Sequence, residues 1–488
     1  MSEYRRGTRI LATLGPATDA PGVIDALVCA GVNAVRLNFS HGAPADHVRR
    51  AQEVREAARR AGVEVGILAD LPGPKIRIDR FADGRVQLRA GDRFALHARA
   101  DAPPGDATGV GVSYLGLPGD VAPGDVLLLD DGMVQLRVLD VDGSTIATTV
   151  LNDGVLSDRK GLNKQGGGLS LGAITDHDRE LIAVAAEIGV DFIAVSFCRT
   201  ADDMHEARRV ARMHDCEAAL VSKIERAEAI ENLGEIIDAS DVVMVARGDL
   251  GVEIGDAELP GIQKKIIRET LARNRVVITA TQMLQSMVES PMPTRAEVLD
   301  VANAVIDGTD AVMLSAETAA GAYPVAAVEA MSRICVGAER QFEHDTDFER
   351  AQRGLQRADQ AIAMGAMFLS EHIGVAAIVA MTESGGTVRF LSRFRSSAPI
   401  YAFSRHAGAR RRMSLMRDVF PMAHDSRGQD ARQAARDAMG LLVAAGLLSA
   451  GDRVVFTSGE TMETHGATNT LRLLQVGADG GAQGLGVL

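Results

Sequence analysis

A lysine and a glutamate stand two residues apart at the end of one apolar run of this sequence. In the segment SKIE, Lys223 and Glu225 would share one face of a β-strand, because successive side chains of a strand point to opposite faces. The next apolar run is followed, after a glycine, by Asp249. One or two carboxylates together with substrate oxygens commonly hold Mg²⁺. These residues therefore predict a site for a divalent cation beside an anionic substrate.

Other polar side chains follow further apolar runs. Arg36, Asn38 and Ser40 alternate in the segment RLNFS, which puts a guanidinium, an amide and a hydroxyl on one face. Such a set suits an anion next to a cation. Hydroxyls and an acid that could orient substrate or relay a proton follow two later runs, at Thr279, Thr281, Ser315 and Glu317. Threonine at a strand end is also what β-propensity alone would produce.

The segment ADLPGPKIR holds an acid, two prolines, a glycine and two cations in nine residues. Asp70 ends an apolar run, and Lys75 comes five positions later, after the Pro-Gly-Pro stretch that must end any strand. This spacing raises the question of what the lysine does at that point of the chain.

Eight short β-rich runs alternate with helical segments, which is the pattern of a (β/α)₈ TIM barrel. The strand candidates are residues 8–14, 33–39, 64–70, 191–197, 218–224, 241–247, 275–281 and 310–316. The helical candidates are residues 21–30, 46–60, 176–188, 202–214, 227–237, 260–273, 295–306 and the segment from 324 onward. The catalytic groups of such barrels lie at the carboxyl ends of the strands, where the polar residues above are found.

The regular alternation is interrupted once and then ends. Residues 74–168 are rich in Gly, Asp and Pro with short strand-like pieces, and predict a small β-barrel lid domain inserted into the barrel, residues 1–73 and 169–342. Three glycines, Gly166 to Gly168, close the insert and suit either a hinge or an ordinary loop. A second α/β alternation predicts a C-terminal domain over 343–488, with a frayed tail from 477.

Length and composition narrow the class of protein. A chain of 488 residues is too long for one hydrophobic core. The net charge of −13 argues against nucleic acid or an anionic membrane as partner. The chain starts without a signal peptide, and it has no apolar run of membrane-spanning length, so a cytoplasmic protein is expected. Its four cysteines lack metal-ligand spacing and are expected to be buried free thiols.

Taken together, these segments resemble the pyruvate kinase family. The matching motifs run through nearly the whole chain in order, and include TLGPAT, RLNFSHG, GPKIR, RKGLN, SKIE, VMVARGDLGVEI, TATQML, PTRAEVLDVANAVIDGTDAVMLSAETAAGAYP and TNT. The resemblance implies a cytoplasmic homotetramer that transfers phosphate from phosphoenolpyruvate to ADP. It also implies a catalytic barrel, a β lid and a C-terminal regulatory domain.

The resemblance assigns roles residue by residue. It gives Glu225 and Asp249 as ligands of Mg²⁺ or Mn²⁺. It places the substrate against Arg36, Lys223, Thr281 and the backbone of Arg247, Gly248 and Asp249. It assigns proton delivery to the region of Thr281, Ser315 and Glu317. It assigns the nucleotide to Pro16, Asn38, His41, Arg77, Lys160 and Asp131, with Asp130 as the alternative to Asp131.

The resemblance also bears on the monovalent cation. In relatives that need K⁺, a site formed by the positions of Asn38, Ser40 and Asp70 holds the ion, and a glutamate stands where this chain has Lys75. Relatives that do not need K⁺ carry a lysine there together with an apolar residue at the position of Leu71. We therefore expect the Lys75 ammonium to replace K⁺.

Regulation is expected to depend on the segment TESGGT of the C-terminal domain. Its hydroxyls, on Thr382, Ser384 and Thr387, fit a phosphate cradle. Glu383 adds an anion there, Gly386 lacks a cation, and the later segment SGETMETHGATNT has no arginine. We expect no strong activation by fructose 1,6-bisphosphate, which leaves a monophosphate, a nucleotide such as AMP, or no effector.

Two other functions fit part of the pattern. A barrel aldolase or lyase acting on pyruvate could use Lys223 for a Schiff base, or the two carboxylates for a metal-bound enolate. The insert with Arg77 and Lys160 argues against it, because an aldolase has no nucleotide to hold. A metabolite-binding regulator without catalysis would be expected to lack Lys223 or a metal carboxylate, and this sequence keeps both.

Overall fold

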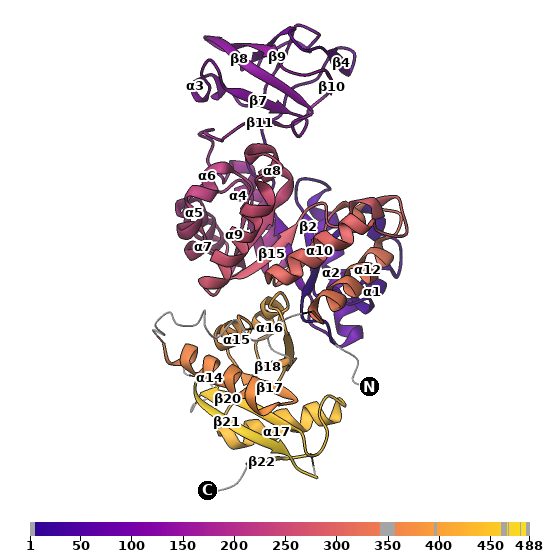
Figure 1. The fold of residues 1–488 in the computed structure, drawn as a ribbon, viewed down its shortest axis with the longest axis vertical. Coiled ribbons are helices and arrows are strands. Elements are labelled where there is room, and N and C mark those ends of the chain that lie inside the picture. The colour runs from indigo at the N-terminus through magenta and orange to yellow at the C-terminus, as the bar shows by residue number, and fades with distance from the viewer. Residues whose placement is uncertain are drawn as a thin grey trace.

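The computed structural model describes residues 5–341, 357–394, 398–459, 466, 468–478 and 480–484. Three bodies follow one another along the long axis of the molecule (Figure 1). A β-rich lid stands at one end, an α/β barrel lies in the middle, and an α/β domain with the C-terminal strands forms the other end.

The middle body is a closed barrel of eight parallel strands, as the sequence predicted. In spatial order the strands are β1 (Arg9–Leu14), β16 (Ala311–Leu314), β15 (Val276–Ala280), β14 (Val242–Ala246), β13 (Ala219–Ile224), β12 (Phe192–Val195), β3 (Gly66–Asp70) and β2 (Ala34–Asn38). Helices cover the outside, so these strands are buried on both faces and read as apolar runs in the sequence.

Most of the outer helices follow the predicted segments closely, and α8 and α11 are additions to them. The outer helices are α1 (Val23–Cys29), α2 (Pro44–Ala61), α4 (Asp176–Ile188), α5 (Ala201–Met213), α6 (Ala227–Glu231), α7 (Leu233–Ala239), α8 (Arg247–Ile254), α9 (Leu259–Ala272), α10 (Arg295–Asp307), α11 (Ala316–Ala319) and α12 (Pro324–Glu339), with the short 3₁₀ turns η1 (Pro16–Thr18) and η2 (Gln285–Val288). The one helix predicted over 227–237 is split into two at Asn232.

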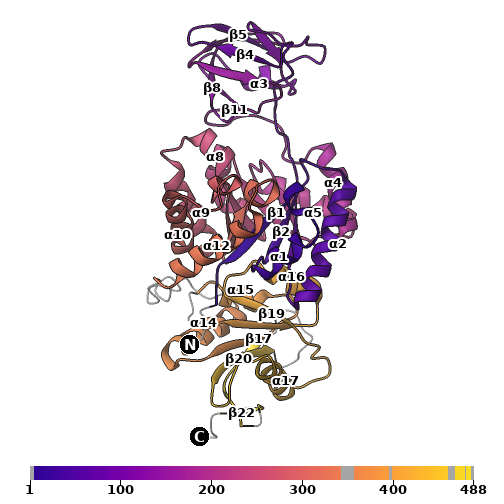
Figure 2. The ribbon, with the colours of Figure 1, turned by 90° about the vertical axis from the view of Figure 1, so that its right-hand side faces the viewer.

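Helix α8 is not among the helices that the sequence predicts. The structure places Asp249 in the first turn of α8, which lies on the lid-facing side of the barrel (Figure 2). The two glycines of RGDLGVEI have low helix propensity, so the sequence of this segment does not indicate a helix.

The lid is built mainly of β-strands, which form two sheets and not the closed β-barrel that the sequence predicted. The larger sheet has the order β11 (Leu162–Lys164), β7 (Val126–Leu129), β8 (Val134–Asp142), β9 (Thr145–Val150), β5 (Arg93–His97) and β6 (Gly109–Gly111). The smaller sheet pairs β10 (Gly154–Ser157) with β4 (Arg85–Leu88), and the short helix α3 (Leu117–Asp120) lies beside them. One apolar cluster fills the lid, so it has a core of its own.

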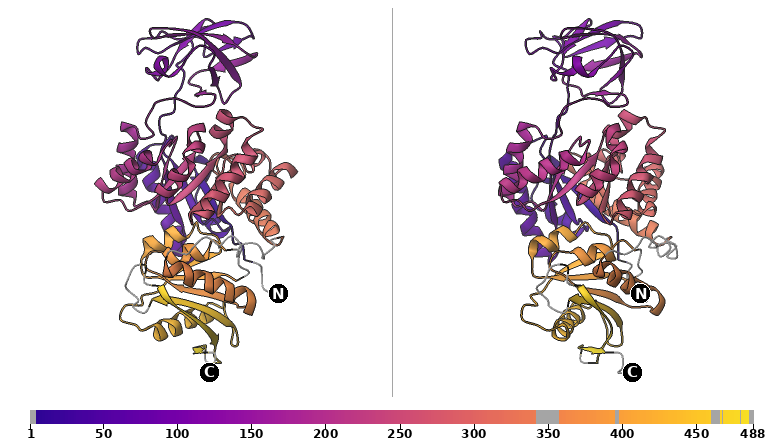
Figure 3. Two further views of the ribbon diagram at one scale, coloured as in Figure 1. Left: turned by 60° about the vertical axis from the view of Figure 1, so that its left-hand side comes forward. Right: turned by 90° about the vertical axis from the view of Figure 1, so that its left-hand side faces the viewer.

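The third body is a six-stranded sheet with helices on it (Figure 3). Its order is β19 (Val419–Ala423), β18 (Ile400–Ser404), β17 (Ala377–Met381), β20 (Arg453–Gly459), β21 (Thr468–Val476) and β22 (Ala482–Gly484). Its helices are α14 (Ala358–Ile373), α15 (Gly386–Leu391), α16 (Ala407–Met413) and α17 (Ala431–Ala444). The predicted boundary at 342–343 falls at the edge of a segment outside the described residues.

Two smaller expectations are corrected. The tail predicted to fray from 477 contributes β22, which pairs antiparallel with β21. Cys29 is exposed at the end of α1, whereas Cys198, Cys216 and Cys335 are buried as expected, and all four thiols are free. Among the described residues, no helix combines the length and the apolar character needed to cross a membrane.

Candidate active site

The lid-facing mouth of the barrel holds a compact cluster of charged side chains. The ammonium of Lys223, on β13, lies 2.8 Å from Glu225 Oε1 and 3.3 Å from Asp70 Oδ1, at the end of β3. Arg36, on β2, places its Nε 2.6 Å from the other oxygen of Asp70. Sequence alternation on β13 predicted that Lys223 and Glu225 share a face, and the structure brings Arg36 and Asp70 to them.

The electrostatics of this cluster follow from burial and from the neighbouring charges. Burial disfavours the charged form of Lys223, but Asp70 and Glu225 outweigh it and raise the pKa of the ammonium. Burial alone would raise the pKa of Asp70, and Lys223 with Arg36 lowers it below its usual value. Burial raises the pKa of Glu225 against the effect of Lys223, and Asp249 adds to the rise. The two carboxylates predicted to bind metal are therefore close enough to interact.

A residue missed at the level of sequence completes the cluster. Ser196 directly follows β12, and its hydroxyl accepts a hydrogen bond from Lys223 Nζ at 2.7 Å. The backbone N–H of Phe197 donates to Glu225 Oε2 at 2.9 Å. Both residues follow a barrel strand, which is the position that defines a site residue in this fold. Their apolar surroundings in FIAVSFC gave no sign of chemistry.

The segments after β14 and β15 form the next part of the site. The side chain of Thr281 accepts a hydrogen bond from Gly248 N at 3.0 Å and so holds the first turn of α8. Thr281 has a backbone φ of 67°, an uncommon conformation for a β-branched residue. Arg247 turns its guanidinium away, toward the carbonyl of Thr281 and the carboxylate of Asp300 at 2.7 Å. The predicted substrate contact of this segment is therefore left to the backbone of α8.

Glu317 has a supporting role in the segments after β15 and β16. Glu317 is fully buried, and its two oxygens accept hydrogen bonds from Leu284 N at 3.1 Å and Ser315 N at 2.6 Å. It thereby joins the segments after β15 and β16. The hydroxyl of Ser315 is buried and has no hydrogen-bond partner within the described part of the chain, so it is free to bond a water molecule or a ligand.

The predicted monovalent cation residues are only partly brought together. Asp70 is occupied by Arg36 and Lys223, and its neighbour Leu71 is buried. Lys75 reaches a different carboxylate: its ammonium lies 3.4 Å from Asp249 Oδ1. The Pro-Gly-Pro turn carries Lys75 out of the barrel strand and over the start of α8. Asn38 Oδ1 accepts a hydrogen bond from Ser40 N at 3.2 Å.

The predicted nucleotide residues are divided between two bodies. Pro16, Asn38 and His41 belong to the barrel, and His41 is exposed. Arg77, Asp131 and Lys160 belong to the lid, which two chain segments join to the barrel (Figure 2). On the lid, Lys160 lies 2.9 Å from Asp130, and Asp131 is exposed beside it. The structure does not bring these two groups of residues together.

The two connecting segments carry glycines in the left-handed backbone region. Gly73 has a φ of 63° on the entering segment, and Gly166, Gly167 and Gly168 have φ values of 79°, 78° and 91° on the returning one. Side chains other than glycine rarely adopt these angles. The triplet thus makes a turn that needs glycine.

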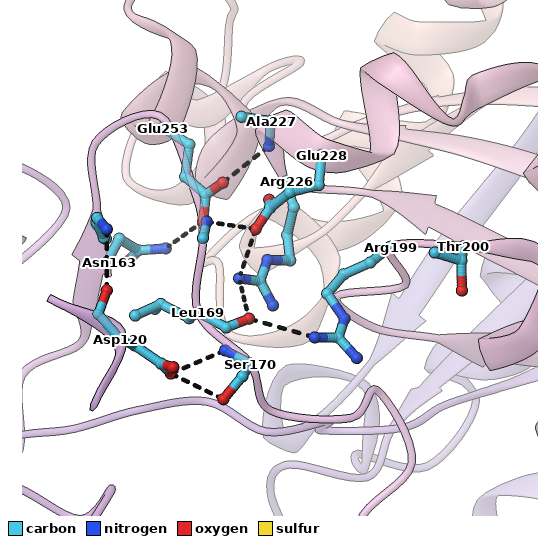
Figure 4. A network of polar contacts seen from close by, with 12 residues as sticks. Asp120, Asn163, Leu169, Ser170, Arg199, Thr200, Arg226, Ala227, Glu228 and Glu253 are labelled. Atoms are coloured by element: carbon cyan, nitrogen blue, oxygen red, sulfur yellow. Dashed lines mark hydrogen bonds and ion pairs between the residues drawn. The ribbon is translucent and has the colours of Figure 1, made fainter. Parts of the chain in front are cut away.

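A polar network ties the returning segment to the barrel (Figure 4). Glu253, on α8, accepts hydrogen bonds from Ala227 N at 2.9 Å and from Asn163 Nδ2, on the lid, at 3.4 Å. Its backbone carbonyl accepts from Gly166 N at 3.2 Å. Burial raises the pKa of Glu253 to about 7. A buried carboxyl group therefore lies where the lid joins the barrel.

The same network continues through Leu169 and Ser170. The carbonyl of Leu169 accepts hydrogen bonds from Arg226 at 3.1 Å and Arg199 at 3.3 Å, both on the barrel. Ser170 donates from its backbone N–H, at 2.8 Å, and from its hydroxyl, at 3.1 Å, to Asp120 of the lid. The backbone carbonyl of Leu169 thus binds the barrel, and the next residue, Ser170, binds the Asp120 carboxylate of the lid (Figure 4).

The C-terminal domain contains a cavity of about 310 Å³ lined by the predicted effector segment. Thr382, Ser384 and Thr387 line it, together with Arg357, Arg389 and Arg405 from other segments. Gly386 itself offers no cation, as the sequence showed, and the cations of this site come from elsewhere in the fold. Two acids, Asp359 and Glu383, also line the cavity and pair with Arg357 at 2.8 Å and Arg405 at 3.1 Å. Most of the later segment, residues 460–465 and 467, lies outside the described residues.

The donor set at the barrel mouth fits a hard divalent cation. Glu225 and Asp249 offer carboxylate oxygens, which Mg²⁺ prefers. Within the described ranges, no group of three or more His, Cys, Asp or Glu side chains is arranged to hold a metal ion. Two carboxylates completed by substrate oxygens are the usual arrangement for Mg²⁺ at a phosphate-transferring site.

A TIM barrel whose mouth holds a lysine, an arginine and two carboxylates that fit a divalent cation, with a lid on two glycine-bearing connections, defines an enzyme that handles an anionic substrate. The family model described as "Pyruvate kinase, barrel domain" matches residues 5–328, and that described as "Pyruvate kinase, alpha/beta domain" matches residues 360–474. The chain belongs to the pyruvate kinase family, and it is a phosphotransferase.

Individual relatives agree with this assignment. The chain is 53% identical to pyruvate kinase II of Salmonella typhimurium over 480 residues, which covers 98% of this chain and all of the relative. It is 49% identical to a pyruvate kinase of Haemophilus influenzae, with the same coverage. Among solved structures, a pyruvate kinase from Cryptosporidium parvum matches with a TM-score of 0.91 and 32% identity, over 96% of each chain. These matches set aside the aldolase and regulator interpretations.

Proposed function

We propose that this enzyme transfers the phosphoryl group of phosphoenolpyruvate to ADP, giving pyruvate and ATP. The observation that supports this most is the position of Lys223, held at the barrel mouth between Asp70 and Glu225, with Arg36 on the far side of Asp70. Phosphoryl transfer needs alignment and positive charge around the transferred group, and little covalent help.

In this proposal each residue acts on a defined part of the substrate. Lys223 and Arg36 lie against the phosphoryl group, and the start of α8 at Gly248 and Asp249 receives the carboxylate, since helix N-termini bind anions. The phosphorus–oxygen bond to enolpyruvate breaks as the bond to the β-phosphate of ADP forms. The enolate carbon then takes a proton from the region of Thr281 and Ser315, which gives pyruvate.

Glu225 and Asp249 would hold Mg²⁺ or Mn²⁺. When bound, the cation supplies positive charge next to the substrate oxygens. The two side chains supply the oxygen donors, and Lys223 and Lys75 compensate their charge in its absence.

The nucleotide would be bound between barrel and lid. Arg77, Lys160 and Asp131 or Asp130 would approach Pro16, Asn38 and His41 by rotation about the glycines of the two connections. Closure would also exclude water, which competes with ADP as acceptor. The Lys160–Asp130 pair supports Asp130 as a partner of the lysine and leaves the exposed Asp131 available to close over the site.

We further propose that the enzyme is a cytoplasmic homotetramer. Support for assembly comes from the outer face of α10, where Leu299 and Ile306 are 64% and 44% exposed. They are seven residues apart and so lie on one side of the helix. Met292, just before α10, is 71% exposed. An apolar stripe of this kind is typical of a subunit contact.

Independence from K⁺ belongs to the same proposal. Asp70, the acidic member of the predicted monovalent site, already pairs with Arg36 and Lys223. The Lys75 ammonium supplies a further fixed charge at the mouth, next to Asp249. Both features lower the need for a bound monovalent ion.

The effector cavity is proposed to take one phosphate group. Three arginines and two acids line it, which leaves about one net positive charge. This charge suits a monophosphate, such as a nucleotide monophosphate, better than a bisphosphate. Saturation curves for phosphoenolpyruvate with and without fructose 1,6-bisphosphate test this, and a severalfold drop in half-saturation would contradict it.

The proposed reaction is tested by coupling pyruvate formation to lactate dehydrogenase and NADH oxidation. Phosphoenolpyruvate, ADP and Mg²⁺ should all be required. Glu225→Ala should abolish binding of the divalent cation at the substrate site, and an unchanged Mg²⁺ activation curve would contradict the assigned metal site. A protein that forms no pyruvate from phosphoenolpyruvate and ADP would refute the function.

A further inference from the structure

Ser196 is positioned between the lysine of the active site and the chain that leads to the lid. Its hydroxyl accepts a hydrogen bond from Lys223 Nζ at 2.7 Å and donates one to the carbonyl of Leu71 at 2.7 Å. The residue is 2% exposed. Because a hydroxyl has one donor, and that donor is fixed on Leu71, its lone pairs are directed to the ammonium.

The residues that follow contact the same strand. Phe197 N donates to Glu225 Oε2 at 2.9 Å, and Cys198 Sγ donates to the carbonyl of Lys223 at 3.3 Å. Three consecutive residues after β12 thus contact Lys223 and Glu225. Phe197 adopts a φ of 57°, in the left-handed region that residues other than glycine rarely occupy. Strain of this kind persists where the surrounding structure holds it, and it is concentrated at functional sites.

The Lys223 ammonium donates a hydrogen bond to Ser196 and forms ion pairs with Glu225 and Asp70, and Asp70 Oδ1 accepts no hydrogen bond within the described part of the chain. Because an ammonium has three N–H donors, a phosphoryl group can bond one of them while the bond to Ser196 is kept. The two carboxylates are charged, and each cancels part of the positive charge that the reaction needs. The hydroxyl of Ser196 is neutral, so it fixes the direction of the ammonium without reducing its charge.

We propose that Ser196 is the positioning residue of Lys223 during phosphoryl transfer. It keeps the ammonium directed at the barrel mouth when the substrate binds. This inference rests on the proposed function and adds to it a residue that touches neither substrate nor metal. The competing explanation is that Ser196 only fixes the chain at Leu71, in which case its loss would affect stability and leave turnover per folded molecule unchanged.

Three variants separate these explanations in the full-length enzyme: Ser196→Ala, Ser196→Thr and Ser222→Ala. Ser222 is the matched control, because it is a fully buried serine next to Lys223 whose hydroxyl has no partner among the described residues. The measurements are kcat and KM for phosphoenolpyruvate, the Kd of Mn²⁺ by calorimetry, and the melting temperature.

Ser196→Ala should lower kcat about 10- to 100-fold, the usual effect of losing a hydrogen bond to a charged group. KM for phosphoenolpyruvate and the Kd of Mn²⁺ should stay within about threefold, because the carboxylates and Arg36 remain. Ser196→Thr keeps the hydroxyl and should recover most of the lost kcat. Ser222→Ala should match the wild type.

Two results would overturn the inference while the proposed function stands. One is an active wild type with Ser196→Ala within twofold of Ser222→Ala in kcat. The other is a loss of kcat matched by equal losses of Mn²⁺ affinity and melting temperature, which Ser196→Thr does not restore. If the wild type forms no pyruvate from phosphoenolpyruvate and ADP, the proposed function fails and the inference fails with it.

Discussion

At the scale of single residues, the central feature is one ammonium shared by two buried carboxylates. Replacing Lys223 by methionine should lower kcat at least about 100-fold, because a preorganised charge at a transition state contributes on the order of 3 to 4 kcal/mol. Phosphoenolpyruvate and Mn²⁺ should still bind, since Arg36 and the carboxylates remain. Steady-state kinetics and Mn²⁺ titration check this.

The variant Lys264→Met is a suitable control, because Lys264 is an exposed lysine of α9 that pairs with Asp307. Since Lys223→Met also leaves Asp70 and Glu225 without their shared cation, circular dichroism must establish the folded fraction. A Lys223→Met enzyme that keeps more than a tenth of wild-type kcat would rule out the assigned role.

Lys75 is the second residue whose charge can be tested. Wild-type activity in tetramethylammonium buffer should stay within about twofold of that in KCl, an allowance for ionic-strength effects. Lys75→Glu should lose activity without K⁺ and regain part of it with K⁺. Lys75 lies 3.4 Å from Asp249, so glutamate there also adds repulsion. Lys75→Met, which removes the charge without adding repulsion, separates the two effects, and a wild type stimulated tenfold by K⁺ would contradict the proposal.

The sequence predicted only some of the residues that meet at the candidate active site. Lys223 and Glu225 could be predicted to converge, because alternation on a strand fixes the face of each side chain. Ser196 could not, because a single serine inside FIAVSFC is indistinguishable from a filler of the core. The pairing of Lys75 with Asp249 depends on how the Pro-Gly-Pro turn meets α8, which is a contact between segments far apart in the chain.

At the scale of elements, strands were predicted more reliably than the connections between them. All eight barrel strands could be predicted, because a parallel strand buried on both faces must be apolar along its whole length. Helix α8 could not be predicted, because it has only eight residues and two of them are glycines, which have low helix propensity. The error matters for function, because α8 carries Asp249 and also Glu253 of the lid connection.

Glu253 makes the lid connection sensitive to pH. Burial raises its pKa to about 7, against the effects of the Ala227 N–H and Arg226, while Glu228 adds to the rise and Asn163 opposes it. The folded state therefore keeps this proton up to about pH 7, whereas the unfolded chain loses it near the ordinary pKa of a glutamate, 4.5. Stability should fall as pH rises through this window, because the unfolded state binds fewer protons there.

The expected size is about 3 kcal/mol between pH 4.5 and 7, at 1.36 kcal/mol per pKa unit. Glu253→Gln removes the titration, so its melting temperature relative to wild type should increase from pH 5 to pH 8. The exposed Glu180 provides the control variant Glu180→Gln. Melting curves of wild type and Glu253→Gln that change in parallel with pH would show that Glu253 does not titrate in this range.

At the scale of the whole molecule, two arginines attach the C-terminal domain to the bottom of the barrel. Arg393, just after α15, makes a bidentate pair with Asp310, which precedes β16. Arg411, on α16, lies 2.7 Å from Asp191, which precedes β12. Both helices lie on the barrel side of the C-terminal sheet (Figure 1). The same strands end at Ser315 and Ser196, so these pairs connect the C-terminal domain to elements that form the active site.

The Arg393–Asp310 pair is the more buried of the two, with side chains 5% and 1% exposed. Asp310 also accepts hydrogen bonds from Val277 N at 2.9 Å and Arg417 N at 3.1 Å. Arg393→Met would leave this carboxylate uncompensated, which typically costs about 3 to 5 kcal/mol. In a double-mutant cycle, Asp310→Asn should recover part of that loss, giving a coupling energy of roughly 1 to 3 kcal/mol. Calorimetric unfolding measures the free energy of unfolding of the wild type, the two single variants and the double variant.

The control is the exposed pair Arg60–Asp25, with side chains 57% and 45% exposed, which should give a coupling energy near zero. Equal coupling energies for the two pairs would mean that Arg393 does not hold the domains together, because a buried charge must depend on its partner far more than one that water already solvates.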